Sequence, residues 1–491
     1  PGATNLVTGI ATANYDSVPL VCITGQVPLG LMGNDAFQEV DIVGITNSIC
    51  KYAVTVRTRE ELPKILKEAF YIARTGRPGP VVVDIPKDIQ QAMGSEEYPT
   101  EVSIRGYKPN DSVHVGQIKK ACTLLKRAKK PLFLLGGGVN IAGANEVMLK
   151  LAEYTQIPVI TTIMGKGSIP TTHDLYLGNI GIHGSYAANH AVSECDVLFS
   201  IGTRFNDRIT GKISEFAKHA KIIHIDADSA SISKNIVVDI PIVADAKLAI
   251  EKLLEYVSPS KAEKWLEQVT EWKKANPINM DKYEGLTPEK VIRYINENIK
   301  HPIVATDVGQ NQLWTTQYLE LESNHQFLTS GGLGTMGYGL GAAIGAKCGC
   351  PDKVVVNIAG DGCFRMNMNE IATATRSEIP VIEVVVNNHV LGMVRQWQNL
   401  FYGERYSSTT LYDKVDFVKL AEAMGAKAKR VETIEEFEAA FKEAVASNEP
   451  YLLDCIIDSD DKVWPMVAPG GSISDAFNEE DLEKQKQEES K

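Results

Sequence analysis

Two apolar runs in this chain each end in polar residues that could hold a metal ion and an anion. Gly360-Asp361-Gly362 follows the run 354–359, and Asn387-Asn388 follows the run 381–386. Such runs predict buried strands of a parallel sheet, whose carboxyl ends share the edge where open α/β sheets bind ligands. One carboxylate and one amide oxygen suit Mg²⁺, which keeps its remaining positions for water and phosphate oxygens. The two strand ends therefore predict a site for magnesium and a diphosphate.

The spacing of these ends resembles the thiamine diphosphate (ThDP) motif, which opens with Gly-Asp-Gly and closes with Asn-Asn. Asp361 and Asn388 lie 27 positions apart, as the motif requires, and Val390 would add a main-chain oxygen to the metal site. Gly360 and Gly362 would let the backbone approach the phosphates. The alternative interpretation is a pair of turn glycines and an asparagine-rich loop. The strand before each half favours the cofactor site.

A second glycine pattern competes with this interpretation. The segment 332–337, Gly-Leu-Gly-Thr-Met-Gly, matches GxGxxG, follows an apolar run and precedes a small-residue helix pattern over 338–347. In a nicotinamide-dependent dehydrogenase this loop would approach the pyrophosphate, and Asp361 would bind the ribose hydroxyls. A lone GxGxxG is a weak signal, and Asp361 already belongs to the Gly-Asp-Gly pattern. The sequence favours the diphosphate–magnesium site and keeps the dinucleotide site as its rival.

Residues at other strand ends predict a nucleotide in the middle of the chain. Gly136-Gly137-Gly138 and Gly202-Thr203-Arg204 each follow an apolar run, and Asp226 ends a third. In this arrangement Arg204 could meet a phosphate and Asp226 a ribose. His183 stands between glycines, where it is either a structural loop histidine or a ligand contact.

Met393 and Trp397 stand four residues apart in a helix pattern that begins soon after Asn388. One helix face would carry both side chains. That face is either part of a core or an apolar wall over the cofactor, and the spacing leaves both interpretations open.

Composition and charge exclude several classes of protein. The chain has 491 residues, a hydrophobic content of 44% and a formal net charge of −12. This length allows about three domains of ~150 residues each. The negative charge argues against nucleic acid or an anionic membrane as a partner. Eight cysteines without a CxxC pair indicate reduced thiols of a cytoplasmic protein. No apolar run approaches the ~20 residues of a membrane span.

Strand-like runs alternate with helix patterns along the chain, which predicts an α/β protein with three doubly wound parallel-sheet domains. The expected domains cover residues 1–97, 113–257 and 287–465, with connectors at 98–112 and 258–286. Residues 466–491 are expected to form a tail. Within it, the stretch 472–491 is polar and acidic, which predicts that this stretch is solvated.

Longer stretches of the sequence are more specific than any of these motifs. They lie at residues 1–6, 25–28, 35–39, 76–80, 164–167, 204–208 (Arg-Phe-Asn-Asp-Arg), 331–337 and 392–398. Through them the chain resembles the catalytic (large) subunits of acetohydroxyacid synthase, also called acetolactate synthase. The resemblance covers nearly the whole chain, up to about Pro469, and is to the FAD-containing biosynthetic branch rather than to the flavin-free catabolic enzymes.

The resemblance implies ThDP-dependent decarboxylation of pyruvate and carboligation to a second 2-oxoacid, either pyruvate or 2-oxobutanoate. The products would be 2-acetolactate or 2-aceto-2-hydroxybutanoate, for biosynthesis of the branched-chain amino acids valine, leucine and isoleucine. The implied cofactors are ThDP, Mg²⁺ and FAD, held by a diphosphate-binding, a pyrimidine-binding and a central FAD-holding domain. The resemblance also implies a cytoplasmic homodimer or homotetramer with active sites at the subunit interface, and a separate regulatory small subunit.

Site residues follow from the resemblance by position. Substrate and catalytic positions are Phe37, Gln38 and Lys87 from the partner subunit, with Met336, Met393 and Trp397, the last at the position that favours 2-oxobutanoate. Positions for ThDP are Val308, Gly309, Gln310, Gly334, Met336, Gly360, Asp361, Gly362, Asn388 and Met393, with Asp361, Asn388 and the Val390 carbonyl as metal ligands. Positions for FAD are Arg77, Gly137, Gly138, Thr162, His183, Arg204, Asp226 and Asp245.

The chain departs from the family pattern at several positions. Asn311 stands where the family has His, Asn206 where it has Asp, and Gly341 where it has Pro. Residues 1–5 indicate a loop without an opening strand, so the first domain is expected to be incomplete. The family's catalytic Glu would lie before Pro1, and the chain as given is therefore expected to be inactive until an upstream segment, which would also carry any targeting signal, is restored.

Other functions remain open from the sequence. The nearest is another enzyme with ThDP and FAD, such as a pyruvate oxidase or a glyoxylate carboligase. The dehydrogenase suggested by GxGxxG and a non-catalytic, cofactor-binding remnant are the more distant alternatives.

Overall fold

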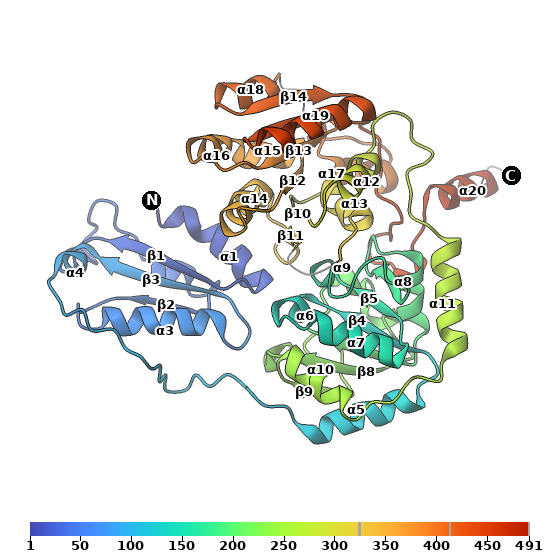
Figure 1. Cartoon of the computed structure of the whole chain (residues 1–491), viewed down its shortest axis with the longest axis horizontal. Coiled ribbons are helices and arrows are strands. Elements are labelled where there is room, and N and C mark those ends of the chain that lie inside the picture. The colour runs from blue at the N-terminus through green and yellow to red at the C-terminus, as the bar shows by residue number, and fades with distance from the viewer. Residues whose placement is uncertain (323–325, 412–413, 490–491) are drawn as a thin grey trace. The chain divides into compact units, whose positions relative to one another are not determined.

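The computed structural model of the protein describes residues 1–322, 326–411 and 414–489. The chain divides into two compact units, Pro1–Asp111 with Ser330–Thr335, and Ser112–Thr329 with Met336–Lys491. The strands form three sheets, one in the first unit and two in the second, and neighbouring strands of each sheet run parallel (Figure 1). The prediction of three parallel α/β sheets is confirmed.

The sheet of the first unit has the strand order β1-β3-β2. Its strands are β1 (Leu20–Gln26), β2 (Tyr52–Thr55) and β3 (Pro80–Pro86), and its helices are α1 (Val7–Asp16), α2 (Ile42–Thr46), α3 (Leu62–Arg74) and α4 (Lys87–Gln91). The central strand β3 is buried along its whole length because β1 and β2 flank it and α3 packs on it. The segment Ser330–Thr335 joins this unit through α1, where the Gly332 amide donates to Asp16 Oδ1 at 2.7 Å.

The central sheet of the second unit has the order β6-β5-β4-β7-β8-β9. Its strands are β4 (Pro131–Leu135), β5 (Val159–Thr161), β6 (Tyr176–Asn179), β7 (Val197–Ile201), β8 (Lys221–Asp226) and β9 (Ile240–Val243). The helices of this part are α5 (Val115–Arg127), α6 (Gly137–Ile141), α7 (Asn145–Thr155), α8 (Tyr186–Glu194), α9 (Asp207–Thr210), α10 (Ala246–Leu254) and α11 (Glu263–Ala275).

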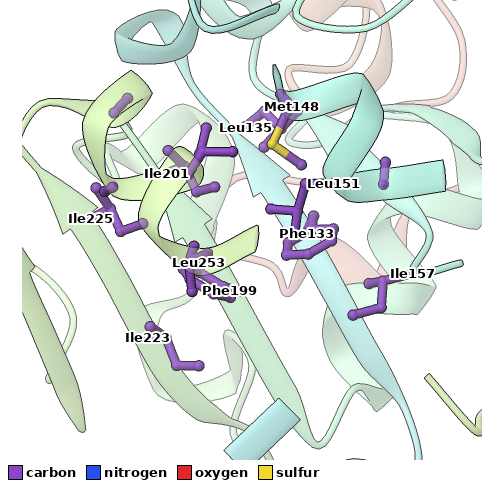
Figure 2. Packing of buried hydrophobic residues seen from close by; sticks show 14 of the residues in the cluster. Phe133, Leu135, Met148, Leu151, Ile157, Phe199, Ile201, Ile223, Ile225 and Leu253 are labelled. Atoms are coloured by element: carbon purple, nitrogen blue, oxygen red, sulfur yellow. The ribbon is translucent and has the colours of Figure 1, made fainter. Parts of the chain in front are cut away.

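Strand register explains why this sheet is apolar on both faces. Phe133 on β4 pairs with Phe199 on β7, which pairs with Ile223 on β8, so these side chains point to the same face. Figure 2 shows them packed against Leu151 of α7 and Leu253 of α10. The intervening strand residues, among them Leu132, Leu134, Leu198 and Ile222, belong to a second cluster with α8 and α11 on the opposite face. Helices therefore cover both faces, as a doubly wound sheet requires.

The C-terminal sheet has the order β11-β10-β12-β13-β15-β14. Its strands are β10 (Ile303–Thr306), β11 (Phe327–Thr329), β12 (Val355–Gly360), β13 (Ile382–Asn387), β14 (Lys427–Val431) and β15 (Tyr451–Ile456). The helices are α12 (Pro288–Asn298), α13 (Gln310–Tyr318), α14 (Tyr338–Gly349), α15 (Asp361–Asn367), α16 (Ile371–Arg376), α17 (Gly392–Phe401), α18 (Phe417–Ala423), α19 (Ile434–Ser447) and α20 (Glu479–Glu489). The apolar runs 354–359 and 381–386 form β12 and β13, which are neighbours in this sheet.

Two stretches are more ordered than their polar composition predicts. The expected connector 258–286 contains the 13-residue helix α11, held by the buried indole of Trp265, whose Nε1 donates to the Pro131 carbonyl at 3.0 Å. The expectation of a solvated stretch from Ser472 onward is wrong at its start, because Ser472 and Ile473 are buried. By contrast, within the described residues no helix or strand lies between α4 and α5, the part of the chain that contains the expected connector 98–112.

None of the helices in the described part of the chain is both long and apolar enough to cross a membrane.

A buried carboxyl pairs with an amide in the middle of the C-terminal sheet. Glu383 on β13 is registered with Asn357 on β12, and Asn357 Nδ2 lies 2.9 Å from each Glu383 carboxyl oxygen. Glu383 is fully buried, and this burial raises its pKa to about 8, against the ordinary value of 4.5. The folded protein therefore keeps a proton that the unfolded chain releases between these pH values.

We predict that Glu383→Gln becomes progressively more stable than wild type as the pH rises from 5 to 8. Wild-type stability falls across this window because the unfolded state binds fewer protons there, at most about 1.4 kcal/mol per pH unit from one group. Glutamine keeps an acceptor for Asn357 and does not titrate. Thermal unfolding of both proteins at several pH values measures the difference, and Glu297→Gln on the exposed side of α12 is the control. A difference in stability between the two proteins that does not change with pH would contradict the raised pKa of Glu383.

Candidate active site

The C-terminal sheet has a topological switch point between β10 and β12. The chain passes from β10 to β11 on one side, and β12 then adds on the other side of β10. Connections that leave the sheet edge in opposite directions open a crevice beyond the carboxyl ends, which is where open α/β sheets bind ligands. Asp307 follows β10, and Asp361 follows β12. This edge therefore collects the residues that the sequence singles out.

Asp361 is a buried carboxylate with an unused oxygen. It is 1% exposed, stands in the first turn of α15, and its Oδ2 has no hydrogen-bond partner. Burial raises the pKa of Asp361 to about 7, although the Gly362 amide and Arg365 act in the opposite direction. A buried carboxylate oxygen without a donor is unfavourable unless a cation or proton meets it. The oxygen is therefore suited to a metal ion.

Asn388 and Val390 lie on the loop that leaves the neighbouring strand. Gly360 is registered with Val386, so Asp361 and Asn388 leave adjacent strands at the same sheet edge. Asn388 is 5% exposed, its Oδ1 accepts from the Val390 amide at 3.3 Å, and its Nδ2 donates to Gln310 Oε1 at 3.3 Å. Within the described residues no three His, Cys, Asp or Glu side chains cluster as metal ligands. A metal here would depend on Asp361 with amide and main-chain oxygens, the donor set that Mg²⁺ accepts.

The start of α13 provides the anion-binding part of the crevice. Gly309 has φ +141°, a conformation that side-chain residues rarely adopt, and it precedes the helix without a capping side chain. The first amides of α13 therefore face the carboxyl edge of the sheet, where a phosphate can accept from them. The Asn311 side chain lies at that edge, where its Nδ2 donates to Thr306 Oγ1 at 3.3 Å and to the Ile358 carbonyl at 3.0 Å, and a methyl group on Gly360 would lie 3.4 Å from its Oδ1. It braces β10 against β12.

Asp307 joins the loop that carries Met336 to this edge. Its carboxylate accepts from the amides of Gly337 at 2.9 Å and Gly339 at 3.1 Å, and also from Val308. Met336 lies beside the Gly-Asp-Gly turn, because a methyl group placed on Gly362 would lie 3.8 Å from Met336 Cε. The structure thus brings Met336 together with the turn that carries Asp361.

Met393 and Trp397 lie on α17, which begins four residues after Asn388. Both are partly buried, and Met393 packs on the C-terminal core. Trp397 makes an edge contact with Phe401, with ring centroids 5.5 Å apart. The helix therefore combines a core contact with partly exposed apolar surface close in the chain to the loop that carries Asn388.

The central sheet has its own switch point between β4 and β7, where two glycine loops approach closely. The Gly138 amide donates to the Gly202 carbonyl at 3.1 Å, and a methyl group on Gly138 would lie 2.6 Å from Gly202 Cα. A methyl group on Gly136 would collide with the Gly202 carbonyl oxygen. Only glycine permits this backbone approach, and glycine loops at a switch point are where open α/β sheets bring their main chain close to a pyrophosphate.

The remaining FAD candidates in the second unit surround the same sheet edge. Thr162 follows β5 and caps the next turn through the Gly165 amide, Asp226 ends β8, and Asp245 caps α10. Arg204, two residues after Gly202, is partly buried, and its carbonyl accepts from Asn235 Nδ2 at 3.0 Å.

His183 is tied to the C-terminal segment. Its Nδ1 lies 3.1 Å from the Pro465 carbonyl, and burial lowers its pKa to about 4, so the ring is neutral at neutral pH. Nδ1 therefore carries the proton donated to Pro465, and only Nε2 is available for a ligand.

The other candidate residues belong to the first unit, and their surroundings within that unit are as follows. Phe37 is 89% exposed, Gln38 is exposed with φ +64°, and Lys87 is an exposed residue at the start of α4. Arg77 donates to Ser17 Oγ at 2.9 Å and to the Asn14 carbonyl. Gly334, with φ +74°, lies in the segment that packs on α1.

Sequence reasoning missed two residues of the C-terminal crevice. Asp307 directly follows a buried strand, so the rule that identified Asp361 would have found it. Gln396, on α17, carries no signal of its own, because an isolated glutamine in an amphipathic helix predicts a solvated face. It is 2% exposed and hydrogen-bonds Gln310.

Family models match three parts of the chain, all described as parts of thiamine pyrophosphate enzymes. The N-terminal TPP binding domain matches residues 1–45, the central domain 118–253 and the C-terminal TPP binding domain 307–455. The last match spans Asp307, Asp361 and Asn388. It supports the Gly-Asp-Gly…Asn-Asn interpretation over the nicotinamide dinucleotide alternative.

Individual relatives are similar over nearly the whole chain. A probable acetolactate synthase large subunit of Methanocaldococcus jannaschii is 49% identical over 96% of this chain and 82% of that protein. The acetolactate synthase large subunit of Corynebacterium glutamicum is 46% identical over 97% and 78%, respectively. An acetolactate synthase of Mycobacterium bovis is 45% identical over 96% and 79%. The chain therefore belongs to the family of acetolactate synthase large subunits, among the thiamine pyrophosphate enzymes.

Proposed function

We propose that this protein is the catalytic subunit of an acetolactate synthase that uses ThDP and Mg²⁺. It decarboxylates pyruvate and joins the remaining two-carbon unit to a second 2-oxoacid, pyruvate or 2-oxobutanoate, on the route to branched-chain amino acids. The observation that supports this most directly is the unpartnered, buried Asp361 carboxylate oxygen beside Asn388 at the β10/β12 crevice. The family membership of the chain selects the reaction among those of ThDP enzymes.

Asp361, Asn388 and the Val390 carbonyl would hold Mg²⁺, and Val308, Gly309 and Gln310 would receive the diphosphate at the start of α13. Bound ThDP would supply the electron sink that allows a 2-oxoacid to lose CO₂. The Gln310 side chain is committed to Gln396, Asp461 and Asn388, so its contribution to phosphate binding would come from its main-chain amide. The glycines flanking Asp361, Gly360 and Gly362, let the backbone approach the anion.

Apolar side chains would shape the reaction space. Met336 would support the bent conformation of the cofactor, because Asp307 fixes the turn that carries it. Met393 and Trp397 would exclude water from the reacting atoms, which favours bond formation with a 2-oxoacid over protonation. Phe37, Gln38, Lys87 and Gly334, all in the first unit, are assigned to substrate approach and to the pyrimidine of ThDP by family position.

We further propose that the central sheet binds FAD, which has no redox task in a condensation without net oxidation and would be structural. The close glycine approach at the β4/β7 crevice supports this proposal. The proposed contacts are Arg77, Gly137, Gly138, Thr162, His183, Arg204, Asp226 and Asp245.

We also propose the domain limits 1–97, 113–257 and 287–465 and a tail within 466–491. The assembly would be a cytoplasmic homodimer or homotetramer with a separate small subunit, as the large-subunit names of the relatives suggest.

The first prediction from this proposal concerns the products. The protein expressed from its complete coding sequence, supplied with ThDP, Mg²⁺, FAD and pyruvate, should form acetolactate and CO₂ without bleaching the flavin. With 2-oxobutanoate in competition, Trp397→Leu should lower the share of 2-aceto-2-hydroxybutanoate several-fold, since the indole would contact the extra methyl group. Product analysis by mass spectrometry measures both. Acetate or acetyl phosphate with a reduced flavin would instead identify an oxidase.

The second prediction concerns Asp361 and pH. Since Mg²⁺ needs the ionised carboxylate and burial raises the Asp361 pKa to about 7, affinity for ThDP with Mg²⁺ should rise as the pH increases from 6 to 8. Binding near pH 6.5 should release about one proton, measurable by calorimetry in buffers of different ionisation enthalpy. With ThDP and Mg²⁺ present at 100 times the Kd, the free energy of unfolding of wild type should increase by about 2.7 kcal/mol.

Asp361→Asn should lose both the Mg²⁺-dependent stabilisation and the pH dependence, whereas Asp352→Asn, on an exposed turn before β12, should keep both. Unchanged Mg²⁺ dependence in Asp361→Asn would refute the metal site.

The third prediction concerns FAD. Gly138→Ala should release most of the bound flavin, because the added methyl group would lie 2.6 Å from Gly202 Cα and must push the two loops apart. Flavin absorbance after gel filtration, with circular dichroism to confirm folding, measures the loss. Gly349→Ala is the matched control, since that glycine is exposed at the end of α14 with no atom within 4 Å of an added methyl group. A folded Gly138→Ala protein with full flavin content would place the flavin elsewhere.

A further inference from the structure

Three buried side-chain amides form a connected network behind the proposed metal site. Gln310 begins α13, Asn388 follows β13, and Gln396 lies within α17. Gln310 Nε2 donates to Gln396 Oε1 at 3.0 Å, and Asn388 Nδ2 donates to Gln310 Oε1 at 3.3 Å. All three are at most 5% exposed, so water does not compete for these bonds.

Every polar atom of the Gln396 side chain has a partner. Its Oε1 also accepts from the Val463 amide at 3.0 Å, and its Nε2 donates to the Val463 carbonyl at 3.0 Å and to Met466 Sδ at 3.4 Å. Two donors on one side and a carbonyl on the other fix the orientation of the amide. Gln396 thereby attaches α17 to the segment that follows β15.

The network continues through Gln310 to both halves of the cofactor site. Gln310 Nε2 also donates to the Asp461 carbonyl at 2.9 Å, which holds the start of α13 against the same segment. A side chain on Gly392, the first residue of α17, would collide with Gln310 Oε1, so this helix begins directly against Gln310. A displacement of the Gln310 side-chain amide would therefore disturb the positions of α13, Asn388 and α17 together.

Gln396 also lies between the two apolar residues assigned to the reaction space. Met393 is three positions before it and Trp397 is its neighbour, and both are partly buried whereas Gln396 is buried. The rotation of α17 about its axis thus depends on where the Gln396 amide is held.

We propose that Gln396 is a positioning residue that couples the orientation of α17 to the metal-ligating amide of Asn388. Through Gln310 it holds Asn388 Oδ1 toward the metal, and through Val463 it sets the placement of Met393 and Trp397. It therefore contributes both to Mg²⁺-dependent cofactor affinity and to the choice of second substrate. The substrate part of this proposal rests on the proposed function, whereas the affinity part rests only on cofactor binding.

The test compares Gln396→Met, Gln396→Glu and Gln398→Met in the full-length holoprotein. Methionine has a similar length and removes all four interactions, while glutamate keeps both acceptor roles and loses the donor. Gln398 is the matched control, because it lies on the same helix but bonds to the Ser407 carbonyl and Thr409 instead. The readouts are the Kd for ThDP at saturating and limiting Mg²⁺, the product ratio with both 2-oxoacids, and the Tm without cofactors.

We expect Gln396→Met to bind ThDP about 10–100-fold more weakly at limiting Mg²⁺, as for loss of an outer-shell partner, and to shift the product ratio. Gln396→Glu should give a smaller effect, and Gln398→Met should match wild type in both. A lower Tm with unchanged Kd and product ratio in the Gln396 variants would show a merely structural role and overturn the proposal. Equal changes in Gln398→Met would do the same.

If Gln396→Met does not fold, Gln396→Glu decides the question with the same readouts. If wild type binds ThDP with Mg²⁺ but makes no acetolactate, the proposed function fails. The affinity part of this proposal is then still supported or overturned by the Kd values.

Discussion

The buried carboxylate of Asp361 is the constraint on which the C-terminal part of the molecule depends. Its position follows from β12, a largely buried strand between β10 and β13, which carries the next residue into a dry sheet edge. The first turn of α15 offers favourable amide dipoles, yet burial dominates and raises the Asp361 pKa to about 7. The fold therefore maintains a group that is unfavourable by itself and that a bound cation would stabilise.

Both sheets of the second unit have a topological switch point, but they create their crevices differently. At β4/β7, glycines on both sides bring two backbones into direct contact, so a ligand at this edge would meet main chain that carries no side chains. At β10/β12, the loops are positioned by hydrogen bonds to buried polar side chains such as Asp307 and Asn311. The first arrangement suits an extended ligand that lies along the backbone. The second suits a compact ion whose partners must be held at defined positions.

The sequence predicted those parts of the site that follow from local rules. Asp361 and Asn388 follow buried strands, and the parallel register alone places them at one edge. The sequence could not show that Gln396 is buried, because its partners on α13 and on the segment after β15 are distant in the chain. The same holds for α11, whose polar sequence suggested a connector although Trp265 anchors it to the central sheet. Long-range packing, rather than propensity, determines these features.

The predominance of amides over carboxylates around Asp361 agrees with the charge of the proposed ligand. A diphosphate brings several negative charges, and a second ionised carboxylate in this dry edge would repel it and would itself resist ionisation. Asp307, the acid that follows β10, is occupied by the amides of Val308, Gly337 and Gly339 and so acts on the loop rather than on the ligand. Neutral side-chain amides provide directional hydrogen bonds here without adding charge, and they belong to Asn388, Gln310 and Gln396. An amide oxygen can also face a metal ion while the side chain remains neutral. One carboxylate supported by neutral amides thus gives a site that can bind a cation and a polyanion together.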